Sequence, residues 1–163
     1  MNHYQPVPGM PSEHKQYQLQ IPQMPILGPN NFGKLLQNVY ESIVDEATAA
    51  DFYSRLLREA PDQLHREFIN HAYQDELEHL EAFTRLYRYF TGQTPQYSIR
   101  PVQYRTYKEG LLIALRDELE AADFYKDIIL SNTDQLVRDT FFLAMGDELE
   151  HSTRFSFLYN LLR

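Results

Sequence analysis

The sequence predicts an all-α protein, a four-helix bundle built from one helical hairpin that is present twice. Four stretches place apolar residues three and four positions apart, which is the spacing of a buried helix face. The second half of the chain also repeats the first at an offset of 72 residues, as between Glu46 and Glu118. Prolines, a glycine and residues typical of helix caps mark the boundaries between the four stretches.

Residues 1–31 differ in composition from the rest of the chain. Six of the nine prolines lie in this segment, and neither a helical nor a strand period holds there. Because proline interrupts long helices, we expect an extended leader, followed by one domain over residues 32–163. A plain tail and a proline-rich segment that binds another protein both fit this composition.

The boundaries of the four expected helices follow from local signals. Asn30 and Asn31 offer an N-cap for the first helix, and Pro61 separates it from the second. Gly92, which can adopt the left-handed conformation, ends the second helix. An irregular connector and a short turn separate the remaining helices. The expected helices are 32–59, 62–90, 103–130 and 134–162.

The internal repeat predicts two antiparallel hairpins. About 20 of the 51 positions from 40 to 90 are identical to the position 72 residues later, against roughly 6% expected by chance. A connector of about ten to twelve residues spans roughly 30–40 Å when extended, and a helix of about 28 residues is some 40 Å long. The third helix can therefore start near the end of the bundle where the second began, although a shorter path with another packing also fits.

The repeat places charged and imidazole side chains on all four apolar stripes. Each hairpin carries one Glu on its first helix and a Glu-x-x-His on its second, and positions i and i+3 share a helix face. Because buried charges need partners, we expect two divalent cations to balance four carboxylates. This is the ligand pattern of di-iron and di-manganese carboxylate proteins, and both metals accept these donors. The alternative is a polar network without metal. The predicted ligands are Glu46, Glu76, His79, Glu118, Glu148 and His151.

Two tyrosines lie two helical turns beyond predicted ligands. Tyr53 and Tyr125 follow Glu46 and Glu118 by seven positions, on the same helix face. Their hydroxyls are candidates to hydrogen-bond a ligand carboxylate or to act as redox-active phenols. The alternative is that both are core aromatic residues.

Four aspartates are candidates to orient the ligands. Asp75 and Asp147 directly precede Glu76 and Glu148, so they are placed to hold a histidine N–H across the bundle. Asp51 and Asp123 also recur in the repeat and are candidates for the same role. We expect the remaining polar residues near the motifs to lie at the surface, namely Glu78, Glu150, His65 and His71.

At these residues the sequence resembles the ferritin-like superfamily, and within it the rubrerythrin-type and erythrin-like proteins. The resemblance covers about residues 32–162. It implies an up-down-down-up four-helix bundle with a crossover connection, and two iron ions, or alternatively two manganese ions, held by the six ligands. The tyrosine that the family places after the first-helix glutamate falls on Tyr53. Ala121 stands where rubrerythrins carry a second glutamate.

The resemblance implies an oxidoreductase that reduces or disproportionates peroxide, or activates O2, with electrons from an external donor. Two alternatives are a ferroxidase or metal-handling protein, and a non-enzymatic protein of a spore coat that retains the metal site. No fifth helix like that of cage-forming ferritins is evident, and we expect a homodimer.

Composition excludes other classes of protein. The chain has no cysteine, which excludes disulfides, iron–sulfur clusters, a rubredoxin-like site and thiol catalysis. A net charge of −8 argues against a nucleic-acid partner. The sequence has no apolar run of membrane-spanning length and no secretory signal pattern. We therefore expect a cytoplasmic location, with spore association as the alternative.

Overall fold

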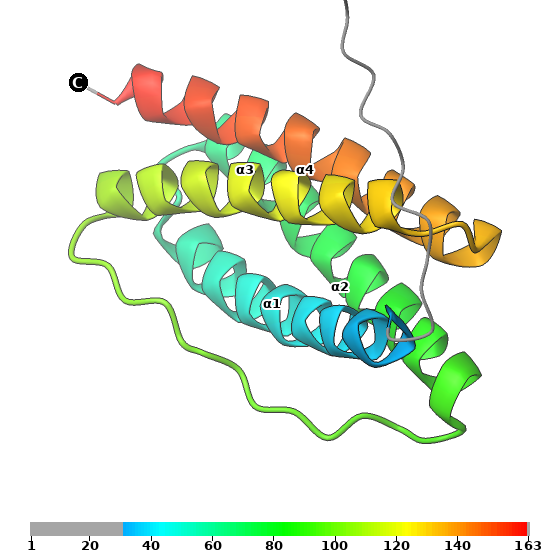
Figure 1. Ribbon diagram of the computed structural model, residues 1–163. Coiled ribbons are helices and arrows are strands. Elements are labelled where there is room, and N and C mark those ends of the chain that lie inside the picture. The colour runs from blue at the N-terminus through cyan, green and yellow to red at the C-terminus, as the bar shows by residue number, and fades with distance from the viewer. Residues whose placement is uncertain (1–30, 163) are drawn as a thin grey trace, which may run out of the picture.

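The computed structural model describes residues 31–162, which form four helices and no strand (Figure 1). The all-α prediction is therefore confirmed for this range. The leader predicted over residues 1–31 lies outside the described residues, except for Asn31 at the start of the first helix. None of the helices in the described range is long and apolar enough to cross a membrane. The helices are α1 (Asn31–Glu59), α2 (Gln63–Thr91), α3 (Tyr107–Ser131) and α4 (Gln135–Leu161).

Side-chain caps fix three of the helix starts. Asp62, Thr106 and Asp134 have extended backbones, and their side chains accept from the backbone N–H three residues later at 3.0–3.1 Å. Such caps satisfy donors that have no partner within the helix. Gly92 ends α2 with a φ of 68°, which confirms the left-handed conformation expected there.

The third helix begins at Tyr107, four residues later than expected from the sequence. Residues 103–106 continue the connector instead. The Tyr104 hydroxyl donates to Glu59 of α1 at 2.7 Å, and Thr106 is the N-cap of α3. The cap and this contact with α1 delay the helix, although the residues themselves are compatible with an earlier start.

The connector between α2 and α3 runs alongside α1. The Tyr40 hydroxyl donates to the Gln96 carbonyl at 2.9 Å, and Arg55 Nη2 donates to the Val102 carbonyl at 2.9 Å. Later residues of the connector therefore contact later residues of α1, and the connector ends near the C-terminal end of that helix. Figure 1 shows the result: α3 starts at the end of the bundle where α2 starts, and α4 returns antiparallel to α3.

The core has two apolar clusters with a polar layer between them. The layer contains the six predicted ligands. On α1, for example, Glu46 lies between the residues of the first cluster and those of the second. Large aromatic side chains pack against one another on both sides of the layer. The first cluster includes Leu35, Val39, Ile43, Phe83, Leu86, Tyr125, Ile128, Val137 and Phe141. The second includes Phe52, Tyr53, Leu56, Ile69, Ala72, Leu111, Ala114, Phe155 and Leu158.

Candidate metal centre

The structure gathers the six predicted ligands into one buried site. They form two groups of four, and within each group one potential ligand atom per residue lies within 4.8 Å of the others. Glu76 and Glu148 belong to both groups, and no member of the set is more than 7% exposed. The arrangement matches two cation positions that share two carboxylates. The groups are Glu46, Glu76, His79 and Glu148, and Glu76, Glu118, Glu148 and His151.

The two histidines turn one nitrogen toward the carboxylates and the other toward an aspartate. His79 Nδ1 lies 3.3 Å from Glu148 Oε1, and His151 Nδ1 lies 3.4 Å from Glu148 Oε2. His79 Nε2 lies 3.1 Å from Asp147 Oδ2, and His151 Nε2 lies 2.9 Å from Asp75 Oδ2. In the tautomer with its proton on Nε2, each ring donates to the aspartate and leaves Nδ1 free to ligate.

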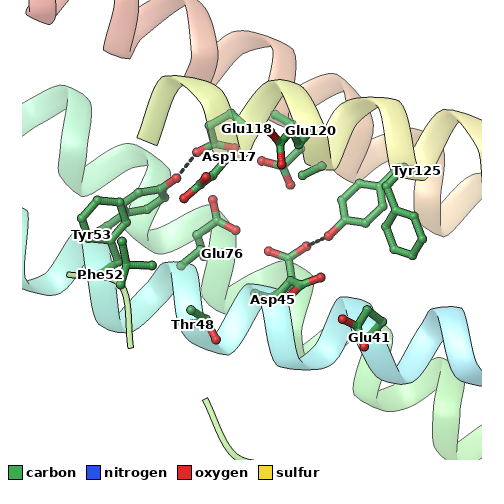
Figure 2. Close-up of a pocket in the computed structure, with 16 residues that line it drawn as sticks. Glu41, Asp45, Thr48, Phe52, Tyr53, Glu76, Asp117, Glu118, Glu120 and Tyr125 are labelled. Atoms are coloured by element: carbon green, nitrogen blue, oxygen red, sulfur yellow. Dashed lines mark hydrogen bonds between the residues drawn. The ribbon is translucent and has the colours of Figure 1, made fainter. Parts of the chain in front are cut away.

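Both tyrosines contact carboxylates across the two hairpins. The Tyr53 hydroxyl on α1 donates to Glu118 Oε1 on α3 at 2.6 Å, and the Tyr125 hydroxyl on α3 donates to Glu46 Oε1 on α1. Figure 2 shows the two rings at opposite ends of the site. Each tyrosine therefore supports the equivalent glutamate of the other hairpin, and the internal symmetry extends to these contacts.

Several buried atoms of the site have no hydrogen-bond partner within the described residues: Glu76 Oε1, both Glu148 carboxylate oxygens, and Nδ1 of both histidines. The Nδ1 atoms lie 3.3–3.9 Å from carboxylate oxygens without the direction of a hydrogen bond. Leaving a buried polar group unpaired costs about 1–3 kcal/mol. These atoms converge on the two groups, so cations would satisfy them, and the residues fit a dinuclear metal centre.

The electrostatics of the site agree with this interpretation. Burial raises the pKa of Glu46 and Glu118 well above the usual range, and neighbouring carboxylates raise it further. Burial alone would lower the pKa of His79 and His151, but contacts with carboxylates raise it far above the ordinary value. Neighbouring carboxylates thus raise the pKa of all four groups, because the site concentrates negative charge that requires protons or cations.

The sequence matches no protein-family model. It is 30% identical over 132 residues to the uncharacterized protein YhjR of Bacillus subtilis (strain 168), an alignment that covers 78% of this chain and 87% of YhjR. The chain belongs to the YhjR family. The name of this relative assigns no chemistry, so the likeness adds nothing to the geometry of the site.

A cavity of about 470 Å³ reaches the site between α1 and α3 (Figure 2). Its walls repeat the internal symmetry, because Asp45 and Asp117 occupy equivalent positions in the two hairpins, as do Phe52 and Phe124. Burial raises the pKa of Asp45 and of Asp117 to about 6. Ala121 lines this cavity with a methyl group, which leaves room where a glutamate would project.

The structure does not bring Asp51 and Asp123 to the metal centre. Asp51 accepts from Arg55 Nε at 3.0 Å, and Asp123 forms an ion pair with Lys126. These partners lie on the same helices as the aspartates. Their recurrence in the repeat therefore reflects the shared origin of two helix surfaces, whereas Asp75 and Asp147 recur because each faces a histidine.

Of the two histidines expected at the surface, His71 is exposed as predicted and His65 is buried, which is a correction. His65 is only 1% exposed, and its Nδ1 lies 2.8 Å from the Tyr107 hydroxyl. Its position four residues before Ile69 places it on the buried stripe of α2, a signal that could have identified it. The His71 side chain is 43% exposed, and its Nε2 lies 3.2 Å from Asp75 Oδ2, the carboxylate that holds His151.

Proposed function

We propose that the chain is a ferritin-like protein that holds two iron ions, or two manganese ions, and uses them in redox chemistry with peroxide or O2. The observation that carries this proposal is the pair of four-residue groups that share Glu76 and Glu148. In this assignment Glu46 and His79 would hold one ion, Glu118 and His151 would hold the other, and Glu76 and Glu148 would be available to both. Two divalent cations then balance four carboxylates.

The arrangement of the helices supports the ferritin-like assignment. The connector follows α1 from one end toward the other, so that two antiparallel hairpins meet with α2 and α3 parallel (Figure 1). This geometry presents a Glu from α1 and α3 and a Glu-x-x-His from α2 and α4 to the same central layer. Carboxylates with imidazole suit iron and manganese, and the chain has no thiolate to favour a softer ion.

The residues around the centre have distinct tasks in this chemistry. A bound iron or manganese pair supplies electrons and Lewis acidity to a small oxygen substrate. The Tyr53 and Tyr125 hydroxyls hold one oxygen of Glu118 and Glu46, which leaves the second oxygen of each free to ligate. Asp75 and Asp147 keep the histidine rings in the ligating orientation. The cavity admits a small molecule, and electrons have to come from an external donor.

A second candidate function is the oxidation or handling of metal ions. The cavity wall adds four carboxylates to those of the centre, from Glu41, Asp45, Asp117 and Glu120. An acidic lining attracts divalent cations electrostatically, whereas it exerts no such attraction on neutral peroxide. Arg100 offsets part of this charge through ion pairs with Glu41 and Asp45 at 2.6 and 3.3 Å. The lining therefore favours Fe²⁺ as a further substrate.

The first experiment measures metal content. The full chain, stripped of metal and titrated with Fe²⁺ or Mn²⁺, is expected to bind two ions per chain, with anomalous scattering at the corresponding absorption edge at both positions. Glu118→Ala should weaken binding far more than Glu120→Ala, its exposed neighbour two positions away. Binding of no ion, or equal effects of the two substitutions, would contradict the proposed centre.

The second experiment separates the two candidate functions. Peroxide consumption by the metal-loaded protein is measured with and without an electron donor, beside the rate of Fe²⁺ oxidation in air. Turnover of peroxide supports the oxidoreductase. Oxidation of added Fe²⁺ without peroxide turnover supports metal handling. Neither activity in a protein that binds two ions would leave the centre as a metal-binding site and reject the redox function.

A further inference from the structure

The outward side of α4 is apolar and uncovered in the described chain. Phe142, Leu143, Leu149 and Phe157 are exposed by 60, 68, 47 and 51%. Together with Gly146 they lie on the side of the helix opposite the stripe that faces the metal centre. We call these five residues the α4 outer face. No residue from 140 to 146 carries a charge.

Gly146 is the unexplained residue of this face. It lies in the interior of α4, where glycine weakens a helix, and among the described glycines only Gly92 has the positive φ that would require it. An added Cβ at Gly146 would meet no described atom within 4 Å. At Gly110, by contrast, Leu56 Cδ1 would stand 2.8 Å from an added Cβ. Packing among the described residues therefore explains Gly110 and gives no reason for Gly146.

The duplicated hairpin shows that the bundle does not need an apolar face at this position. On α2 the positions equivalent to Phe142, Leu143 and Gly146 are Asn70, His71 and Gln74, and the position equivalent to Phe157 is Arg85. All four α2 residues are exposed. The two helices hold equivalent places in the bundle, so only α4 has acquired a surface suited to a partner.

We propose that the α4 outer face binds the same face of a second copy of this chain, with the twofold axis close to Gly146. In a twofold interface one patch has to be complementary to itself. This face offers a notch at Gly146 and large side chains within one turn on either side, so each copy can place Phe142 or Leu149 over the notch of the other. The missing side chain lets the two helix backbones approach closely.

The size of the face favours a second copy as the occupant. The exposed apolar side chains of α4, with Leu136 and Leu161 at 47 and 48% exposure, offer on the order of 600 Å². A standard interface buries about 800 Å² per partner, so this helix supplies most of it. Two chains of net charge −8 repel each other. The stretch 140–146 beside the proposed axis carries no charge, and of the exposed carboxylates on the same side of α4, Asp139 and Glu150 lie two turns and one turn away, with Glu150 paired to Arg154 of its own helix.

The test measures the mass of the full chain by sedimentation and light scattering over a range of concentrations. We expect a dimer of the 19.3 kDa chain. The variant Phe142→Asn/Leu143→His/Gly146→Gln places the α2 residues on α4, and it should be a monomer with an unchanged helical spectrum. The matched single changes are Leu149→Gln, which should weaken the dimer at least tenfold, and Leu77→Gln at the equivalent α2 position, which should not.

A cross-linking experiment tests the position of the axis without relying on the triple variant. Because the chain has no cysteine, Glu150→Cys introduces a single thiol one turn from Gly146 on the same side of α4, and a short dimaleimide should join two chains there while the glycine notch stays intact. Glu78→Cys, at the equivalent exposed α2 position, should give no cross-linked dimer. A wild-type monomer at all concentrations, a dimer that survives the triple change, or equal cross-linking of both cysteine variants would each overturn the proposal.

Discussion

The two hairpins have kept the same inward face and acquired different outward ones. Inside, the glutamates, histidines, supporting tyrosines and aspartates occur in equivalent pairs, and each pair makes equivalent contacts. Outside, α2 is polar where α4 carries Phe142, Leu143 and Gly146. The candidate centre uses residues of both hairpins and so would constrain both copies equally. A surface that meets a partner on one hairpin would constrain only that hairpin, so the difference between the outward faces supports a role for α4 that the shared centre does not explain.

The largest expected effect comes from the shared carboxylates. Glu76→Gln and Glu148→Gln each remove a charge that both cation positions use, so each should reduce the affinity for both ions by more than the roughly 10–100-fold typical of supporting groups. Calorimetric titration of the metal-free chain measures this. Glu78→Gln, two positions away and exposed, should bind two ions normally. Loss of only one ion in either variant would show that the two cation positions do not share these carboxylates.

A smaller effect is expected from the aspartates behind the histidines. Asp75→Asn and Asp147→Asn should each lower metal affinity roughly 10–100-fold, because an amide holds the imidazole less firmly than a carboxylate. Asp75, whose side chain is 22% exposed against 46% for Asp147, also contacts His71 and should show the larger loss. Asp123→Asn is the control. An effect of Asp123→Asn as large as the others would mean that charge alone, rather than histidine orientation, sets the affinity.

The inward half of this comparison could be predicted from the sequence. The ligands repeat at a fixed offset on apolar stripes, and a buried charge on such a stripe has few explanations. Asp75 and Asp147 were predictable because they adjoin ligands. The acceptor of the Tyr53 hydrogen bond could not be predicted. Periodicity places a residue on one face of its helix, but it does not say whether the acceptor lies on the same helix or on a facing one.

Other features depended on tertiary contacts that local patterns do not record. The late start of α3 follows from the Thr106 cap and the contact between Tyr104 and α1. His65 was assigned to the surface because it has no histidine counterpart in the repeat, although its spacing from Ile69 places it on the buried stripe. The α4 outer face is visible in the sequence only when α2 and α4 are aligned and the outward positions are compared, which requires knowing which side faces the core.

The two tyrosines test whether the hairpins are equivalent at the candidate centre, and we expect an effect of moderate size on stability. Tyr53→Phe and Tyr125→Phe each leave one buried carboxylate oxygen without its donor, which should lower the free energy of unfolding of the metal-free chain by about 1–2 kcal/mol. Urea denaturation measures this, with Tyr89→Phe as the control because that side chain is 70% exposed. Clearly unequal losses at the two positions would show that the hairpins are not equivalent at the centre.

The smallest expected effect separates the two roles of α4. Gly146→Ala should raise the free energy of unfolding by about 1 kcal/mol in a Phe142→Asn/Leu143→His background, because alanine favours a helix and its Cβ meets open space. We expect that background to be monomeric, since it lacks two of the four large side chains of the α4 outer face. In the otherwise wild-type chain the same change should weaken the dimer, since a Cβ at the notch keeps the partner helix away. Thermal unfolding of the first and sedimentation of the second provide the two measurements. A gain in stability without any loss of dimer would place Gly146 outside the contact, and a loss of stability in the monomeric background would mean that glycine is required by α4 itself.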